Sequence, residues 1–73
     1  MDVVVNLRSG RRTSVDEPLY LLVRSSGADS QEKVTDFQSF RILPEQEVTV
    51  VGSHSTAVFP PGEIEFVEFR SNG

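Results

Sequence analysis

The stretches that decide the fold are residues 42–51, ILPEQEVTVV, and residues 58–67, VFPPGEIEFV, which share one pattern. Each has two apolar residues, a corner led by proline, an acidic residue and then an apolar run. Proline fixes φ and donates no backbone hydrogen bond, so it favours a corner between strands. We therefore expect each copy to form a strand, a tight corner and a second strand.

The N-terminal third of the chain also has the alternation of strands. Residues 2–7 alternate, and a glycine follows in the turn, so residues 12–15 are predicted to pair back as a hairpin. Residues 19–24 form the most apolar run of the chain and are bounded by Pro18. A short continuous apolar run is typical of a buried strand. We expect this strand at the centre of the sheet, with both faces buried.

The last predicted strand, residues 63–70, changes face midway. With simple alternation, Ile64 and Phe66 lie on one side, and Val67 and Phe69 lie on the other. Either both faces are buried or a bulge near residues 65–67 redirects the side chains.

The segment between residues 25 and 43 is predicted in two ways. In the first, residues 25–36 form a mobile loop with at most one helical turn, and a strand runs from Phe37 to Leu43. The preferred fold class is then all-β: one domain over residues 1–73, a small barrel or sandwich of about six short, mainly antiparallel strands. In the second, a short helix around residues 29–40 gives a β-grasp-like α+β fold.

The small size of the chain favours association with another protein. Seventy-three residues are close to the lower limit for a domain that folds alone. The chain has no cysteine and one histidine, so we expect no disulfide, metal or cofactor to supplement the core. The missing disulfide scaffold favours an intracellular, cytoplasmic setting. Nothing resembles a signal peptide, and no apolar run approaches the ~18 residues of a membrane span.

Few residues are candidates for catalysis. His54 could act as a base beside Ser55, but adjacent residues of an extended chain point to opposite faces. Glu63 and Glu65 could act as paired carboxylates, but glutamate alternating with apolar residues is typical of a strand with one solvated face. The acids between residues 29 and 36 lack the spacing of a calcium loop. We expect neither an enzyme nor a metal site.

The clearest surface signal is the basic group Arg8, Arg11 and Arg12, in a chain whose formal net charge is −4. Arginines on a hairpin could bind a phosphate or an acidic partner. The negative net charge disfavours nonspecific binding to nucleic acid, because that affinity depends on neutralising phosphates. Small β-barrels nevertheless bind single strands through aromatic faces and basic loops.

The preferred function is a noncatalytic protein-interaction or assembly module that self-associates, such as a small structural subunit or an inhibitor protein. The alternative is a single-stranded nucleic-acid-binding β-barrel that uses the basic group. We expect self-association at the last strand, since an unpaired apolar strand edge can recruit another chain. The predicted partner-binding residues are Arg8, Arg11, Arg12, Glu65, Val67 and Phe69.

Overall fold

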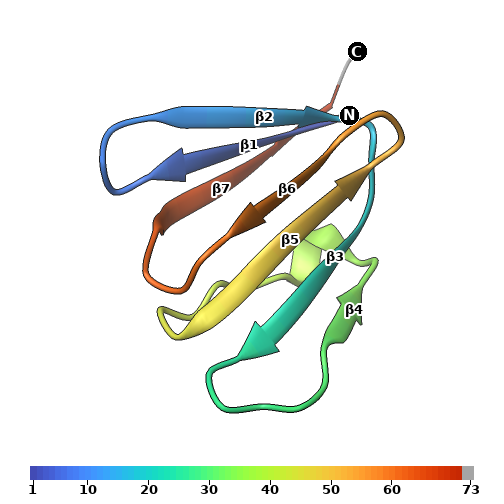
Figure 1. The fold of residues 1–73 in the computed structure, drawn as a ribbon. Coiled ribbons are helices and arrows are strands. Elements are labelled where there is room, and N and C mark those ends of the chain that lie inside the picture. The colour runs from blue at the N-terminus through green and yellow to red at the C-terminus, as the bar shows by residue number, and fades with distance from the viewer. Residues whose placement is uncertain (72–73) are drawn as a thin grey trace.

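The computed structural model describes residues 1–71, which form two antiparallel sheets (Figure 1). The three-stranded sheet has the order β2-β1-β7, with β1 at Asp2–Leu7, β2 at Arg12–Asp16 and β7 at Ile64–Arg70. The four-stranded sheet has the order β4-β3-β5-β6, with β3 at Pro18–Ser25, β4 at Glu32–Val34, β5 at Gln46–Gly52 and β6 at Thr56–Phe59. The sheets do not close into one barrel. The all-β prediction is confirmed, and the helix over residues 29–40 is wrong.

The two sheets share one hydrophobic core. Its members alternate along the strands, because successive residues of a strand face opposite sides. The most exposed of them has 7% of its surface accessible. The three-stranded sheet contributes Val3, Val5, Val15 and Ile64, and the four-stranded sheet contributes Leu21, Val23, Val48, Val50 and Phe59.

Strand β3 lies inside its sheet but is buried on one face only. It pairs with both β4 and β5, which confirms its predicted central position. Leu21 and Val23 face the core, whereas Tyr20 and Leu22 are half-buried on the other face. Leu19 lies at an irregularity of the pairing and is 56% exposed. The prediction that both faces are buried is wrong, because no element among residues 1–71 packs over the outer face.

A bulge in β7 decides which side chains enter the core. The pairing of β7 with β1 shifts at Glu65, which has no partner. Because of this extra residue, Ile64, Val67 and Phe69 all face the core side. Phe66 lies on the opposite side and is 48% exposed. The predicted bulge is confirmed, and the expectation that Ile64 and Phe66 share a side is wrong.

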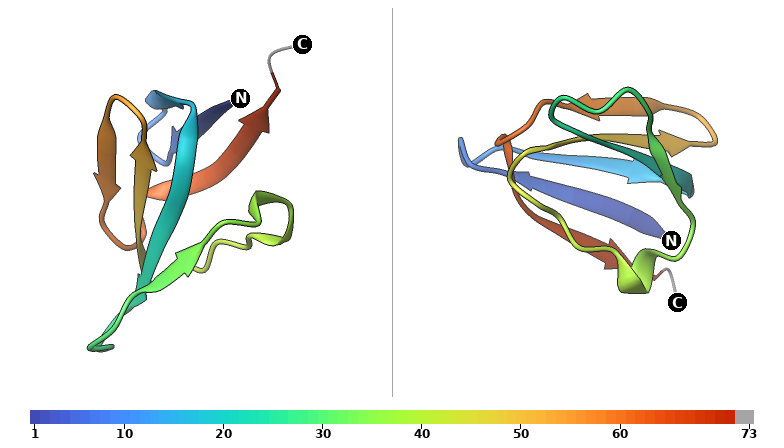
Figure 2. Two further views of the ribbon diagram at one scale, coloured as in Figure 1. Left: turned by 90° about the vertical axis from the view of Figure 1, so that its right-hand side faces the viewer. Right: turned by 90° about the horizontal axis from the view of Figure 1, so that it is seen from below.

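The segment between β4 and β5 contains no strand, so the prediction of one from Phe37 to Leu43 is wrong. It forms a single 3₁₀ turn, η1 (Phe37–Ser39), and then runs irregularly to β5. The ring of Phe37 stacks on Phe69 with centroids 5.1 Å apart, and Phe40 meets Phe69 edge-on at 6.5 Å. These contacts hold the segment against β7. The segment therefore lies on the side of the molecule where β7 is the edge strand of one sheet and β4 the edge strand of the other (Figure 2).

Of the two copies of the repeated pattern, only the second forms strand, corner and strand. At its corner the N–H of Glu63 donates to the carbonyl of Pro60 at 3.3 Å, and Gly62 has φ of 83°. Such a positive φ at the third residue is what a type II turn requires. The predicted corner is confirmed. In the first copy, irregular chain precedes Pro44 and only β5 is a strand.

We expect Phe69→Ala to destabilise the fold more than Phe66→Ala. The Phe69 substitution removes two ring contacts and a side chain packed against the core, whereas Phe66 is 48% exposed on the outer face. The expected losses in free energy of unfolding are about 2–3 kcal/mol and less than about 1 kcal/mol. Urea unfolding of the two variants measures the difference, and equal losses would contradict the packing described here.

Gly52→Ala tests the close approach between the sheets at the end of β5. A Cβ at Gly52 would lie 2.6 Å from Cγ1 of Val15 and 3.0 Å from the backbone oxygens of Asp16 and Ser55. Since Val15 is 2% exposed, it has little room to move. Overpacking of this kind costs about 1–3 kcal/mol, measurable by urea unfolding. The control Ser53→Ala, on the exposed neighbour, should change stability by less than about 0.5 kcal/mol.

Candidate functional site

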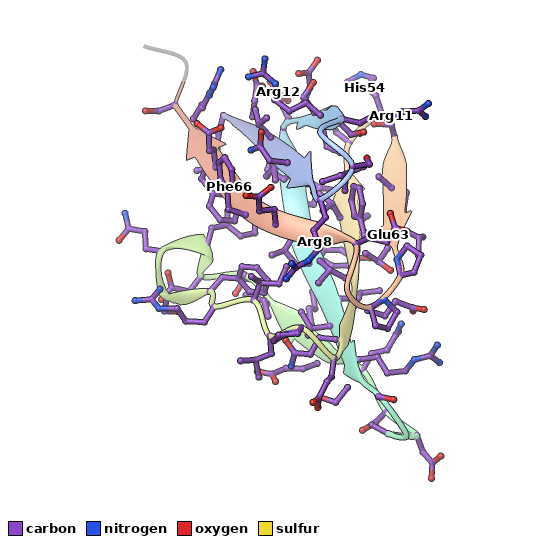
Figure 3. All side chains as sticks on the ribbon, turned by 90° about the vertical axis from the view of Figure 1, so that its left-hand side faces the viewer. Arg8, Arg11, Arg12, His54, Glu63 and Phe66 are labelled. Atoms are coloured by element: carbon purple, nitrogen blue, oxygen red, sulfur yellow. The ribbon has the colours of Figure 1, made fainter. Side chains whose placement is uncertain are left out.

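The three arginines of the predicted basic group do not form one surface. Arg8 lies in the β1–β2 turn, Arg12 begins β2, and Arg11 lies between them. Their side chains point in different directions (Figure 3). The ion pairs found among residues 1–71 involve other arginines, Arg24 and Arg70. The hairpin therefore does not gather the three positive charges on one surface, as binding to the phosphate backbone of a nucleic acid would require.

Of the predicted residues of the last strand, Val67 and Phe69 lie together and line one hollow, and Glu65 lies apart from them. Val67 and Phe69 are half-buried and pack against the core, whereas Glu65 is exposed in the bulge. Arg8 and Glu65 meet at a different hollow from that of Val67 and Phe69. Partner binding by these residues stays a prediction.

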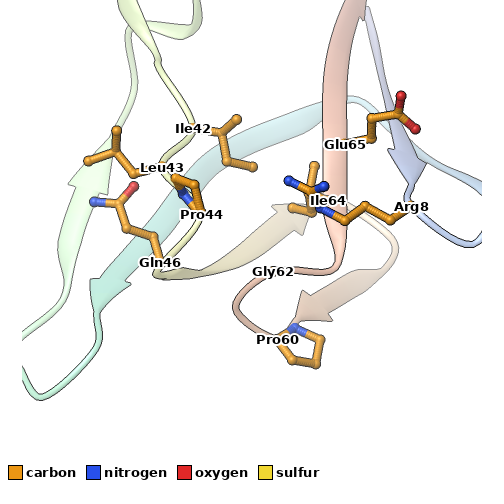
Figure 4. Close-up of a pocket in the computed structure, with 9 residues that line it drawn as sticks. All are labelled: Arg8, Ile42, Leu43, Pro44, Gln46, Pro60, Gly62, Ile64 and Glu65. Carbon is orange, nitrogen blue, oxygen red and sulfur yellow. The ribbon is translucent and has the colours of Figure 1, made fainter.

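This hollow lies where the two proline-led corners approach each other (Figure 4). The N–H of Arg8 donates to the carbonyl of Glu63 at 2.9 Å, which ties the β1–β2 turn to the second corner. The hollow has a volume of about 130 Å³. Its walls are mainly apolar, and the lining residues are Arg8, Ile42, Leu43, Pro44, Gln46, Pro60, Gly62, Ile64 and Glu65.

A second surface, the apolar face, is the outer side of the four-stranded sheet. The strand pairing places Leu22, Thr49 and Val58 side by side in one row across β3, β5 and β6. Val58 is 59% exposed, although it is a large apolar side chain. We define the apolar face as Tyr20, Leu22, Thr49, Val51, Thr56 and Val58.

The charges around the apolar face are largely matched within the chain. Arg24 pairs with Glu47, with N and O 3.4 Å apart. The ammonium of Lys33 lies 4.5 Å from the ring centroid of Tyr20, where the π-system attracts a cation. The face is thus close to neutral in a chain that is acidic overall.

The outer side of the three-stranded sheet carries more charged side chains than the apolar face does, although Val4 and the half-exposed Phe66 also lie on it. On it, Nδ2 of Asn6 donates to Glu68 at 3.1 Å, and Arg70 pairs with Glu68 at 3.2 Å. The hydrogen bond from Asn6 and then that from Arg70 lower the pKa of Glu68, because both stabilise the carboxylate. Ser14 and Asp16 of β2 lie on the same outer side of this sheet.

His54 does not form a catalytic constellation. Ser53 Oγ lies 2.8 Å from His54 Nδ1, a contact that strand alternation did not predict because residues 53–54 form a bend. Both residues are exposed. Asp2, Asp16 and Glu17 border the same hollow as His54, but among residues 1–71 no carboxylate hydrogen-bonds to the imidazole and no group of acids and histidine is arranged to hold a metal. A nucleophile needs a base that a third group orients.

Sequence reasoning missed the apolar face. The signal was present in the alternation of residues 20 and 22, 49 and 51, and 56 and 58. Their common side became visible only once the pairing of β3, β5 and β6 was known.

Comparisons with protein-family models, curated proteins and solved structures found no match to this chain. The helical structure in residues 1–71 includes nothing long and apolar enough to cross a membrane. Function therefore has to be inferred from the surfaces of the chain itself.

The carboxyl of Glu68 should titrate below the ordinary glutamate range, and Asn6→Ala should raise its midpoint. A lowered folded-state pKa means that ionised Glu68 stabilises the fold above the unfolded-state pKa of about 4.3, and this stabilisation is lost as the pH falls through the folded-state pKa. Carboxyl ¹³C NMR titration measures the midpoint. Ser14→Ala, on the same sheet face, should leave it in place; an unchanged midpoint in Asn6→Ala would contradict the assigned cause.

Proposed function

We propose that this chain is a noncatalytic protein-interaction module that self-associates through the apolar face. The observation that carries the proposal is Val58, which is 59% exposed and lies in one row with Leu22, on the far side of the buried Thr49, on the outer face of the sheet. Contiguous exposed apolar surface is costly in water and marks an interaction site. An intracellular setting belongs to the same proposal and depends on the absence of cysteine.

Charge favours a second copy of this chain as the partner. Two molecules of net charge −4 repel each other, so they meet most easily where acids are fewest. The charged side chains on this side of the sheet are Arg24, Lys33 and Glu47, with a formal sum of +1 (two positive, one negative). Face-to-face packing of two sheets is a standard arrangement that buries such residues.

The area of the apolar face indicates a weak dimer. Three strands about 4.8 Å apart and about 13–20 Å long cover roughly 200–300 Å². Two copies would bury roughly 400–600 Å², below the ~1,000 Å² expected of a stable interface. We therefore expect reversible association at concentrations of about 10–100 μM or above.

The hollows support protein binding over small-molecule chemistry. The main ones among residues 1–71 have volumes of about 130 to 290 Å³. Small-molecule sites are typically roughly 300–1,000 Å³. The nucleic-acid alternative loses support because its three arginines point in different directions (Figure 3).

Val58→Lys should weaken self-association at least about tenfold, because the dimer would bury an unpaired charge. Sedimentation equilibrium over about 10 μM to 1 mM measures the dissociation constant. Ser14→Lys is the matched control: it adds the same charge at an exposed outward position of the edge strand β2, on the three-stranded sheet.

The control variant should dimerise as the unchanged chain does. A chain that stays monomeric at about 1 mM, or equal weakening by both substitutions, would overturn the proposal.

A further inference from the structure

We infer that the hollow beneath Arg8 binds the C-terminal residue of a partner peptide, with its carboxylate on Arg8 and its apolar side chain in the hollow. This site is separate from the apolar face and shares no residue with it. The inference therefore goes beyond self-association.

The walls of the hollow select an apolar group. Pro44 and Pro60 are rigid rings from the two corners, and Ile42 and Ile64 contribute aliphatic surface. Leu43, at the same hollow, is 56% exposed and would be covered by a ligand. The volume of about 130 Å³ is close to that of cavities that hold one benzene-sized group, about 150 Å³. There is room for one side chain.

Arg8 selects a carboxylate beside that side chain. In Figure 4 its side chain reaches across β7 toward the hollow, and it forms no ion pair within residues 1–71. A guanidinium binds a carboxylate through two parallel hydrogen bonds. A phosphate would favour several cations, and this hollow has one.

The small size of the hollow distinguishes a chain terminus from an internal acidic residue. In a C-terminal residue the carboxylate and the side chain share one Cα, so both fit a space for a single residue. An internal aspartate or glutamate would need a second residue to supply the apolar group. Peptide termini are a recognised target of protein-binding modules.

Glu65 modulates the site without blocking it. Its carboxylate points away from the hollow in Figure 4, although the residue belongs to the lining. Its negative charge opposes an incoming carboxylate, and at the surface this effect is modest. Removing the charge should therefore improve binding slightly.

The test is a ¹⁵N NMR titration of the whole chain with two probes, N-acetyl-leucine and N-acetyl-leucine amide. We expect the acid to shift the amide signals of residues 42–43, 45–46 and 62–65, with a dissociation constant of about 1–10 mM for so small a ligand. The amide should bind at least about fivefold more weakly, because it cannot form the charged pair.

Substitutions then assign the contact to Arg8. Arg8→Gln should weaken binding of the acid about tenfold, and Glu65→Gln should tighten it about twofold. Arg11→Gln is the matched control: it removes the same charge from the same hairpin, but its side chain points elsewhere (Figure 3). Binding by this control should change less than about twofold.

Three results would overturn the inference: equal binding of acid and amide, equal loss in the two arginine variants, or no shifts around the hollow at about 20 mM probe. A blocked tetrapeptide ending in leucine, with a free or an amidated terminus, tests the peptide source, and only the free acid should bind. Because the site is independent of the apolar face, repeating the titration on Val58→Lys separates failure here from failure of self-association.

Discussion

The bulge at Glu65 is the constraint on which most of this structure depends. By adding one residue to β7, it turns Ile64, Val67 and Phe69 to the same side. Phe69 then provides the ring on which Phe37 and Phe40 pack, so the irregular segment before β5 has a fixed place. Without the extra residue, alternation would direct Phe69 toward solvent and leave that segment without an anchor. The hollow beside Ile64 follows from the same geometry.

The positions of most strands were predictable because their causes are local. Gly10 and Gly62 have positive φ, the conformation for which glycine is favoured, and Pro60 marks the corner before β7. The segment around η1 was not predictable in this way. Phe40 and Ile42 alternate as in a strand, but their place is decided by Phe69, roughly thirty residues away in the sequence, and tertiary contacts commonly override local pattern.

The surfaces were predicted less well than the strands, for a related reason. The sequence places Arg8, Arg11 and Arg12 close together, yet spacing along a turn says little about where side chains point, and the three diverge. Conversely, Leu22 and Val58 are far apart in sequence, and two strand pairings place them in one row, on either side of Thr49. Which charges cluster and which apolar residues adjoin is a property of register, and a shift by one residue would exchange the two faces.

Register also explains why the two outer faces differ so much in a chain this small. The residues facing inward are nearly all aliphatic on both sheets, so the core places no demand on what lies outside. On the three-stranded sheet the outward positions include the hydrogen-bonded Asn6 and Glu68, together with Val4 and the half-exposed Phe66. On the four-stranded sheet the outward positions carry Leu22 and Val58, whose apolar side chains are unfavourably exposed to water. In a monomer, polar residues on both outer faces would avoid the free-energy cost of exposed apolar surface. The difference between the faces therefore favours a molecule that covers one face with another copy.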